Sequence, residues 1–328
     1  MPVIDQQPHR DRIFAQFINP KIRADLRKSL GQKDMQRLCI HFQCHCFPHL
    51  PRCRNVAAKP WEGKQLDILH REDRGAVAHL TMNAPERLNA LSDAMLAALT
   101  DCLNTIAQDP DVRVVVLAGA GKAFCAGHDL KEMQAGRQAE DDGAAYFKDL
   151  FDRCAALMLR IQSLPQPVIA QVHGIATAAG CQLVATCDMA VAADDTRFGV
   201  NGVNIGLFCS TPMVALTRNI PRKAAFEMLT TGRFVNTREA YALGLINRAV
   251  PADMLAREVR EMADVIASKL PSAVRIGKQA FYQQAQMTTQ EAYDYAGDIM
   301  VYNMMEPDTD EGITAFLEKR APGWSDKD

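Results

Sequence analysis

The sequence predicts an α/β fold with a helical C-terminal extension. Strand-like apolar segments alternate with amphipathic helical segments up to about residue 250, which is typical of a sheet covered by helices. From residue 254 onward the pattern is helical throughout. Hydrophobic residues make up 48% of the 328, which is enough for a large core. We therefore expect an N-terminal arm at 1–60, a core at 61–260 and a helical region at 261–328.

The expected core begins with two strands and a capped helix. Segments 65–71 and 75–82 have strand composition and flank a turn signal at 72–75. Ser92 is the expected N-cap of a helix that ends near Gln108, because apolar residues then recur at helical spacing.

The rest of the core follows the same alternation. We expect strands over 112–118, 167–172, 189–192 and 246–250, with a short strand and a loop within 197–207. We expect a helix to start at Asp129, a Gly-punctuated loop at 134–143, and further helices over 144–161, 180–187, 211–219, 221–231, 254–269, 272–285, 289–305 and 309–319. Thr237 is the expected cap of a short helix that ends at Gly244.

Residues 1–60 form a separate basic segment. They carry 11 Lys and Arg against four Asp and Glu, and their lack of periodicity predicts disorder. Cysteines and histidines cluster between Cys39 and Cys53, but their spacings match no zinc template, so we expect no metal site. An organelle-targeting segment and an upstream extension before a start at Met35 both remain open.

Charge and cysteine use restrict the class of protein. The net charge of −2 and the absence of a run of 18 apolar residues argue against nucleic-acid and membrane partners. Outside the arm, cysteines are scattered through apolar segments, as expected for reduced thiols in an intracellular compartment. They are Cys102, Cys125, Cys154, Cys181, Cys187 and Cys209.

Two short stretches carry the functional signal. In the first, KAFCAGHDLKEM (122–133), Gly127 permits a sharp turn, and the N–H of His128 then points toward a cavity at a helix start. In the second, GIATAAGCQLVATCDM (174–189), a turn of small residues at 176–180 again opens a helix. Two N–H groups, one from each turn, predict an oxyanion hole.

These stretches resemble the signatures of the enoyl-CoA hydratase/isomerase (crotonase) superfamily. The resemblance rests on Phe124 to Glu132 and Gly174 to Asp188, and it extends from Trp61 to Trp324. Within the superfamily the runs ATAAGCQLVATCDMAVA and GVNIGLFCSTP are most similar to the enoyl-CoA hydratase domain-containing protein 3 group. The resemblance implies a crotonase (ClpP-like) spiral of ββα units and an acyl-CoA ligand without a further cofactor or metal. It also implies a homotrimer or dimer of trimers.

The family's functional positions are carried over residue by residue. The oxyanion donors fall on the N–H groups of His128 and Ala179, where Ala replaces the usual Gly. The implied CoA contacts are Arg87, Leu88, Ala126, Asp129, Leu130, Phe316 and Lys319. The family uses the motif acids Asp129, Glu132 and Asp188 structurally.

The family's proton-transfer groups are absent. The two hydratase glutamates fall on Gln182 and Gly202, and the carboxylate position of the dienoyl-CoA isomerases falls on Ser210. Acid–base groups are worth about 10²–10⁴-fold each, so we expect weak or no hydration.

Three alternatives stay open. His128 is a possible acid or base for an acyl-CoA decarboxylase or thioesterase, and a methylmalonyl-CoA decarboxylase of the superfamily has similar A-G-H-D and V-N-x-G motifs. Cys209 and Ser210 are candidate nucleophiles, but Cys209 and Cys181 are more simply explained as small buried packing groups. A non-catalytic acyl-CoA-binding protein is the third alternative. We expect a cytoplasmic protein if the source is bacterial and a mitochondrial matrix protein if it is eukaryotic.

Overall fold

The structure is a computed structural model that describes residues 68–324. The predicted arm, its Cys and His cluster and the start at Met35 lie outside the described residues, so those predictions are untested. None of the helices in the described part is long and apolar enough to cross a membrane. The described part is an α/β unit with a helical C-terminal region, as predicted.

A six-stranded sheet forms the centre of the core. Its order is β1-β2-β3-β4-β6-β9, with β1 antiparallel to β2 and every later pair parallel. The strands are β1 (Leu69–Arg74), β2 (Val77–Met82), β3 (Val114–Gly119), β4 (Val168–Val172), β6 (Met189–Ala193) and β9 (Arg248–Val250). The inner strands are apolar runs because helices cover both faces of the sheet.

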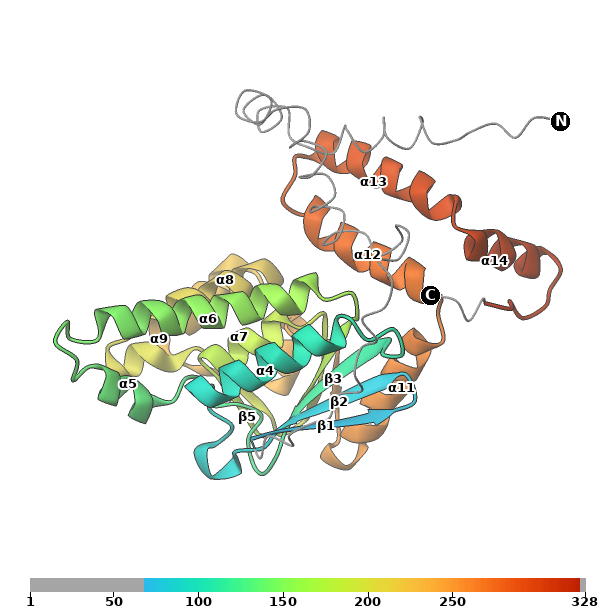
Figure 1. The fold of residues 1–328 in the computed structure, drawn as a ribbon. Helices are drawn as coiled ribbons and strands as arrows, with labels where there is room; N and C mark the ends of the chain where they lie inside the picture. Colours follow the sequence, from blue (N-terminus) through green and yellow to red (C-terminus); the bar gives the residue numbers. More distant parts are fainter. Residues whose placement is uncertain (1–67, 325–328) are drawn as a thin grey trace, which may run out of the picture. The chain divides into compact units, whose positions relative to one another are not determined.

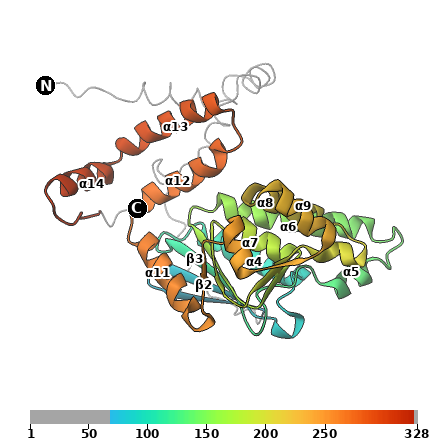
Figure 2. The same cartoon turned by 180° about the vertical axis from the view of Figure 1, so that it is seen from behind.

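Helices cover the two faces unequally. Figures 1 and 2 show α4 (Asp93–Ile106) and α11 (Leu255–Ala267) on opposite sides of β1–β3. The larger core lies on the side of α4, α6 (Ala144–Ser163) and α7 (Ala179–Thr186). On the other side, Val259 and Ala263 of α11 pack on valines of the sheet. Ser92 caps α4, as predicted, and accepts a hydrogen bond from the Met95 amide at 3.2 Å.

A second, three-stranded sheet carries part of the candidate site. It has the order β5-β7-β8 and consists of β5 (Ile175–Thr177), β7 (Arg197–Gly199) and β8 (Phe234–Asn236). The sequence analysis missed β5 and β8, because three residues are too few to show a period.

Two local predictions were wrong. The first strand continues to Arg74, and the turn lies at Gly75–Ala76, where Gly75 has φ +61°. The polar residues at 72–74 pair in antiparallel register with 77–79 of β2, so they belong to the strand and not to a turn. The short helix α10 (Thr237–Leu243) is capped by the Asn236 side chain, not by Thr237. The Thr237 hydroxyl instead donates to the backbone carbonyls of Ala193 and Thr196.

The remaining elements follow the predicted order. They are η1 (Pro85–Arg87), α5 (Leu130–Gly136), η2 (Asn201–Ile205), α8 (Ser210–Asn219), α9 (Arg222–Thr231), η3 (Ala252–Met254), α12 (Pro271–Gln284), α13 (Thr289–Met304) and α14 (Pro307–Leu317). The helices predicted for the C-terminal region are confirmed to within two residues at each end. The domain boundary predicted at residue 60 stays a prediction.

A buried ion pair fixes α12 to the core. Lys278 is 8% exposed, and its ammonium donates to Asp188 at 2.7 Å and to the backbone carbonyls of Ile161 and Gln166. Asp188 also accepts from the Val168 amide and the Tyr282 hydroxyl. This motif acid therefore has a structural role.

Candidate active site

The two motif loops lie side by side as a short parallel ladder. The Phe124 amide donates to the His173 carbonyl at 3.1 Å, and the Cys125 amide donates to the Ile175 carbonyl at 3.2 Å. The Thr177 amide donates a hydrogen bond of 3.0 Å to the Cys125 carbonyl. A Cβ on Gly180 would lie only 2.2 Å from that carbonyl, so α7 starts directly against the first loop.

The two predicted donor amides follow this ladder. Gly127 has φ +92°, and a Cβ on it would lie 2.9 Å from the Ala178 Cβ and 3.3 Å from the Ala179 nitrogen. The turn that presents His128 therefore packs against the turn that presents Ala179. Within residues 68–324, neither of these two amides donates a hydrogen bond. Ala179 is the first residue of α7, where an N–H has no acceptor within the helix.

The strained residue is Ala178. It comes one position before Ala179, where the resemblance implies that Ala replaces the usual Gly. Its φ of 49° and ψ of −120° are unfavourable for a residue with a Cβ. Its amide donates to the Gly199 carbonyl at 2.9 Å, which holds this conformation. Ala179 itself has its side chain buried and begins a regular helix.

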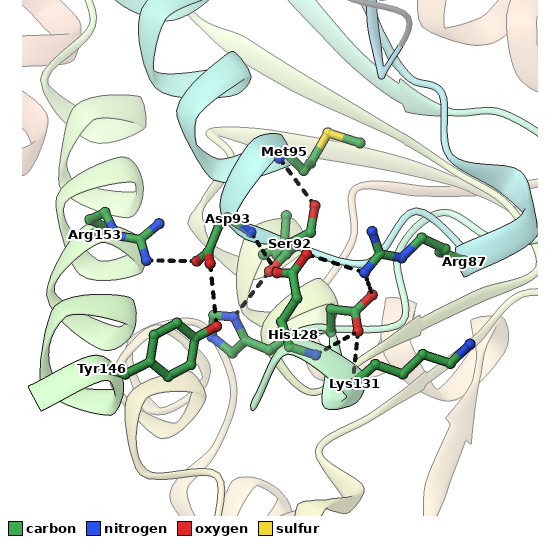
Figure 3. Close-up of polar contacts among 11 residues, drawn as sticks. Arg87, Ser92, Asp93, Met95, His128, Lys131, Tyr146 and Arg153 are labelled. Carbon is green, nitrogen blue, oxygen red and sulfur yellow. Dashed lines mark hydrogen bonds and ion pairs between the residues drawn. The ribbon is translucent and has the colours of Figure 1, made fainter. Parts of the chain in front are cut away.

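The His128 imidazole is half-buried next to the starts of α4 and α6 (Figure 3). Its Nδ1 lies 3.4 Å from the Leu91 carbonyl, and its ring meets Phe151 edge-to-face. Its Nε2 is buried without a partner among the described residues. Burial lowers the pKa of His128, and the positive charge of Arg153 acts in the same direction. The ring is therefore neutral at pH 7, and Nε2 is a free acceptor when Nδ1 carries the hydrogen.

A polar network holds the first motif to α4. Asp129 caps α5 by accepting from the amides of Lys131 and Glu132, and it forms an ion pair with Arg87 (Figure 3). Burial alone would raise the pKa of Asp129, but these two amides and Arg87 lower it below the usual value. Glu132 also pairs with Arg87 and accepts from the Asp93 amide at 2.8 Å. Arg87, an implied CoA contact, is thus already engaged by two carboxylates.

The two hydratase-acid positions have different surroundings. Gln182 is buried, and its Oε1 has no hydrogen-bond partner in the described part of the chain. Gly202 is also buried, and a Cβ on it would lie 2.3 Å from the Leu207 carbonyl oxygen and 2.9 Å from the Cys209 Sγ. The Leu207 carbonyl and the Cys209 thiol therefore occupy the space that a side chain at 202 needs.

The two candidate nucleophiles lack activation. Burial raises the pKa of the Cys209 thiol, so the thiolate is scarce at pH 7. The Ser210 hydroxyl donates to the Phe208 carbonyl at 3.4 Å. Neither side chain is hydrogen-bonded to an imidazole within residues 68–324. Burial likewise raises the pKa of the Cys181 thiol, to about 12.

The other implied CoA positions lie on the surface or in the backbone of the first loop. The Leu88 carbonyl accepts from the Ala126 amide at 3.0 Å, and Leu130 is exposed at the start of α5. Phe316 of α14 is 82% exposed, so packing among residues 68–324 does not explain it. Lys319 follows α14 with φ 57°.

Sequence reasoning missed several residues around the site. The Thr177 hydroxyl donates to the Asn201 side chain, which ties the second loop to η2. Near His128, Asp93 pairs with Arg153 at 2.7 Å and accepts from the Tyr146 hydroxyl at 3.5 Å (Figure 3). Of these residues only Asp93 has a signal in the sequence, because acidic residues are typical of the first turn of a helix. The other partners come from distant segments.

A polar cleft of about 290 Å³ lies on the other face of the main sheet. It is lined by the outer residues of β1 and β2, among them Glu72 and His79, and by Arg260 of α11. None of the predicted site residues lines it, so the candidate site is elsewhere.

The sequence matches the Enoyl-CoA hydratase/isomerase family over residues 72–327. It is 45% identical over 249 residues to the mitochondrial enoyl-CoA hydratase domain-containing protein 3 of Rattus norvegicus, covering 76% of this chain and 81% of that protein. The structure is similar to the crystal structure of an enoyl-CoA hydratase from Mycobacterium smegmatis, with a TM-score of 0.75 and 55% identity over 78% of this chain and 98% of that one.

A crystal structure of human enoyl-CoA hydratase domain-containing protein 3 is similar as well. It has a TM-score of 0.75 and 42% identity, and the match covers 78% of this chain and 100% of that one. The predicted crotonase fold and the resemblance to this group are thereby confirmed. The chain belongs to the enoyl-CoA hydratase/isomerase (crotonase) family.

Proposed function

We propose that this protein is an acyl-CoA enzyme of lipid metabolism that stabilises a thioester enolate but does not hydrate double bonds efficiently. One observation carries the proposal: the loops of His128 and Ala179 are paired, and neither amide is used elsewhere in the described chain. A thioester oxygen between two such amides would accept both hydrogen bonds. Each donor is worth about 10²–10³ in rate when negative charge develops on that oxygen.

The same residues argue against efficient hydration. Gln182 cannot exchange a proton at neutral pH, and Gly202 provides no side chain. Hydration requires water to lose a proton and the α-carbon to gain one. Without either carboxylate the amides alone would leave a slow hydratase.

Acetoacetyl-CoA gives a direct test, because its enolate has its own near-ultraviolet absorbance. We expect the wild-type chain to raise the enolate band on binding, and Gly127→Ala to abolish the increase. The added Cβ would lie 3.3 Å from the Ala179 nitrogen and would crowd the bound oxygen. Gly277→Ala is the matched control, since nothing lies within 4 Å of a Cβ there. An unchanged band in the wild type, or rapid hydration of crotonyl-CoA, would refute the proposal.

A second candidate is an acyl-CoA decarboxylase or thioesterase, favoured by the unpartnered Nε2 of His128. Loss of CO₂ forms the enolate without a base, and a neutral imidazole could instead activate water for thioester hydrolysis. Methylmalonyl-CoA separates the two reactions, because decarboxylation releases CO₂ whereas hydrolysis releases a free thiol. Binding of acyl-CoA without either product would leave the non-catalytic alternative.

We also propose that the protein is a homotrimer or a dimer of trimers. In the part of the chain that the structure describes, helix α13 has no buried residue, and α13 and α14 expose large apolar side chains. They include Tyr293, Met300, Val301, Met305, Phe316 and Leu317. Large apolar side chains that are exposed together on a helical region favour contact with another subunit. Light scattering after size exclusion would show a monomer if the proposal is wrong.

For localisation we propose the mitochondrial matrix in a eukaryotic cell and the cytoplasm in a bacterial one. The relative from Rattus norvegicus is a mitochondrial protein by name, which supports the first part. Fractionation of cells that express the full chain tests it.

A further inference from the structure

The polar cleft between α11 and the main sheet takes no part in the candidate active site. Its volume is about 290 Å³, which at the density of liquid water is room for about ten water molecules. A small molecule therefore fits. Further along the same face the sheet is apolar, and Val114 and Ile169 form one buried cluster with Val259 of α11. At the cleft this face is polar, so hydrogen-bonding groups lie where apolar packing is the rule.

The strand register builds the floor of the cleft. Thr81 of β2 pairs with Ala118 of β3, and Ala118 pairs with Gln171 of β4, so the three side chains form one row on one face of the sheet. The small Ala118 side chain leaves a hollow between the two polar ones. Each residue is the last but one of its strand, at the carboxyl ends of three parallel strands. Ligands of open α/β sheets typically bind at these ends.

Four polar side chains that line the cleft make no hydrogen bond or ion pair within residues 68–324. They are His79, Thr81, Gln171 and Arg260. The first three are half-buried, so water reaches them only in part. Polar groups that are withdrawn from water usually have a partner, so these four indicate that the cleft holds a ligand or ordered water.

The charges of the cleft favour an anion. Glu72 and Arg74 neutralise each other, because their side chains form two hydrogen bonds, of 3.0 and 2.7 Å. Arg260 has no carboxylate within ion-pair distance among the described residues, so its guanidinium gives the cleft a net positive charge. Burial lowers the pKa of His79, and the charges of Arg74 and Arg260 act in the same direction. Glu72 and Asp264 oppose the shift without cancelling it. The ring is therefore neutral at pH 7 and still donates one N–H.

We propose that the cleft binds a small molecule through a phosphate or carboxylate group, with Arg260 as the cation and three further donors beside it. The planar guanidinium matches a pair of oxygens of either group. The imidazole N–H of His79, the hydroxyl of Thr81 and the amide NH₂ of Gln171 each donate to a remaining oxygen. A cation would be repelled by Arg260, and an apolar ligand would leave all four donors unpaired. Acyl-CoA chemistry at the motif loops plays no part in this binding.

Isothermal titration calorimetry of the full chain with inorganic phosphate and with succinate tests the proposal. Sodium chloride at the same ionic strength is the reference, because it contributes only general screening. We expect one saturable site per chain for at least one of the two anions, with a Kd of about 1 mM, which corresponds to about two charge-assisted hydrogen bonds. The anion that binds more tightly identifies phosphate or carboxylate as the preferred group.

Two arginine variants on α11 form a matched pair. Arg260→Gln should weaken binding of the preferred anion at least about tenfold, because it removes the positive charge from the cleft. Arg257→Gln should leave the Kd unchanged, since Arg257 does not line the cleft and pairs with Glu258 and Glu261. Both arginines are exposed, so both variants should fold. Ala118→Val, which narrows the hollow without changing a charge, should weaken binding as well.

Heats no larger than those with sodium chloride would overturn the proposal, and a carboxylate of a second copy seated in the cleft would produce that result. Unchanged affinity in Arg260→Gln would overturn it too, because the anion would then be bound elsewhere. An equal loss in Arg257→Gln would show an effect of general surface charge and have the same consequence. None of these outcomes bears on the His128 and Ala179 amides, which acetoacetyl-CoA tests separately.

Discussion

Replacing Gly202 with alanine tests whether the second hydratase position is closed. A Cβ at 202 would lie 2.3 Å from the Leu207 carbonyl oxygen, whereas carbon–oxygen contacts normally begin near about 3.3 Å. The Leu207 carbonyl or the backbone at 202 must therefore move by about 1 Å. The Cys209 Sγ, 2.9 Å from the same Cβ, and the 3.0 Å bond from the Leu207 amide to the Gly202 carbonyl limit that movement.

The expected cost follows from this crowding. Inserting a methyl group into a packed region costs about 1–3 kcal/mol. For a domain of this size each kcal/mol lowers Tm by about 2–4 °C, so we expect a loss of about 2–12 °C. Differential scanning calorimetry at equal protein concentration measures it. Gly277→Ala, in an exposed part of α12, should instead gain about 0.5–1 kcal/mol because alanine favours a helix.

The same geometry predicts the outcome of restoring both glutamates. Gln182→Glu with Gly202→Glu should hydrate crotonyl-CoA no faster than Gln182→Glu alone, because the second carboxylate has no room beside Leu207. A Gly202→Ala variant as stable as the wild type would refute the reasoning. So would a double variant whose hydration rate clearly exceeds that of the single one.

Three further predictions concern the buried ion pair, the strained turn and the imidazole. Lys278→Met should lower the unfolding free energy by about 3–5 kcal/mol, since it leaves the partly buried Asp188 carboxylate without its cation. A loss below about 1 kcal/mol in urea titrations would contradict this. Ala178→Gly should raise the unfolding free energy by about 1 kcal/mol, because glycine relieves the strain at φ 49°. Ala179→Gly, in the helix, should lower the unfolding free energy by a similar amount. If Ala179→Gly were the more stable of the two variants, Ala178 would not be strained. The folded-state pKa of His128 lies below its ordinary value of 6.5, so its stabilising contribution is present above pH 6.5 and is lost as pH falls through the folded pKa. The unfolding free energy of the wild type minus that of His128→Asn should therefore decrease from pH 7 to pH 5, and a constant difference would show that this imidazole is not buried as described.

The sequence by itself determined the fold class and the family, and it predicts the two donor amides. These depend on local signals in the sequence. They are the periodic spacing of apolar residues, the Ser92 helix cap, and small residues at positions where two backbones come into contact. Gly127 and Gly180 are such residues, because close approach of two chains excludes any side chain. The same local signals missed β5 and β8, whose few residues pair only in the folded chain.

Tertiary structure alone decided what surrounds each predicted residue. It placed Arg87 on two carboxylates, left the Gln182 Oε1 and the His128 Nε2 without partners among the described residues, and put Leu207 where a side chain at 202 would lie. The contacts of Arg87 join segments that are far apart in the sequence, whereas the contact of Leu207 with 202 depends on how one short loop folds back on itself. Residue types and spacing show which groups a chain carries, but packing between distant segments determines which of them remain free to meet a ligand.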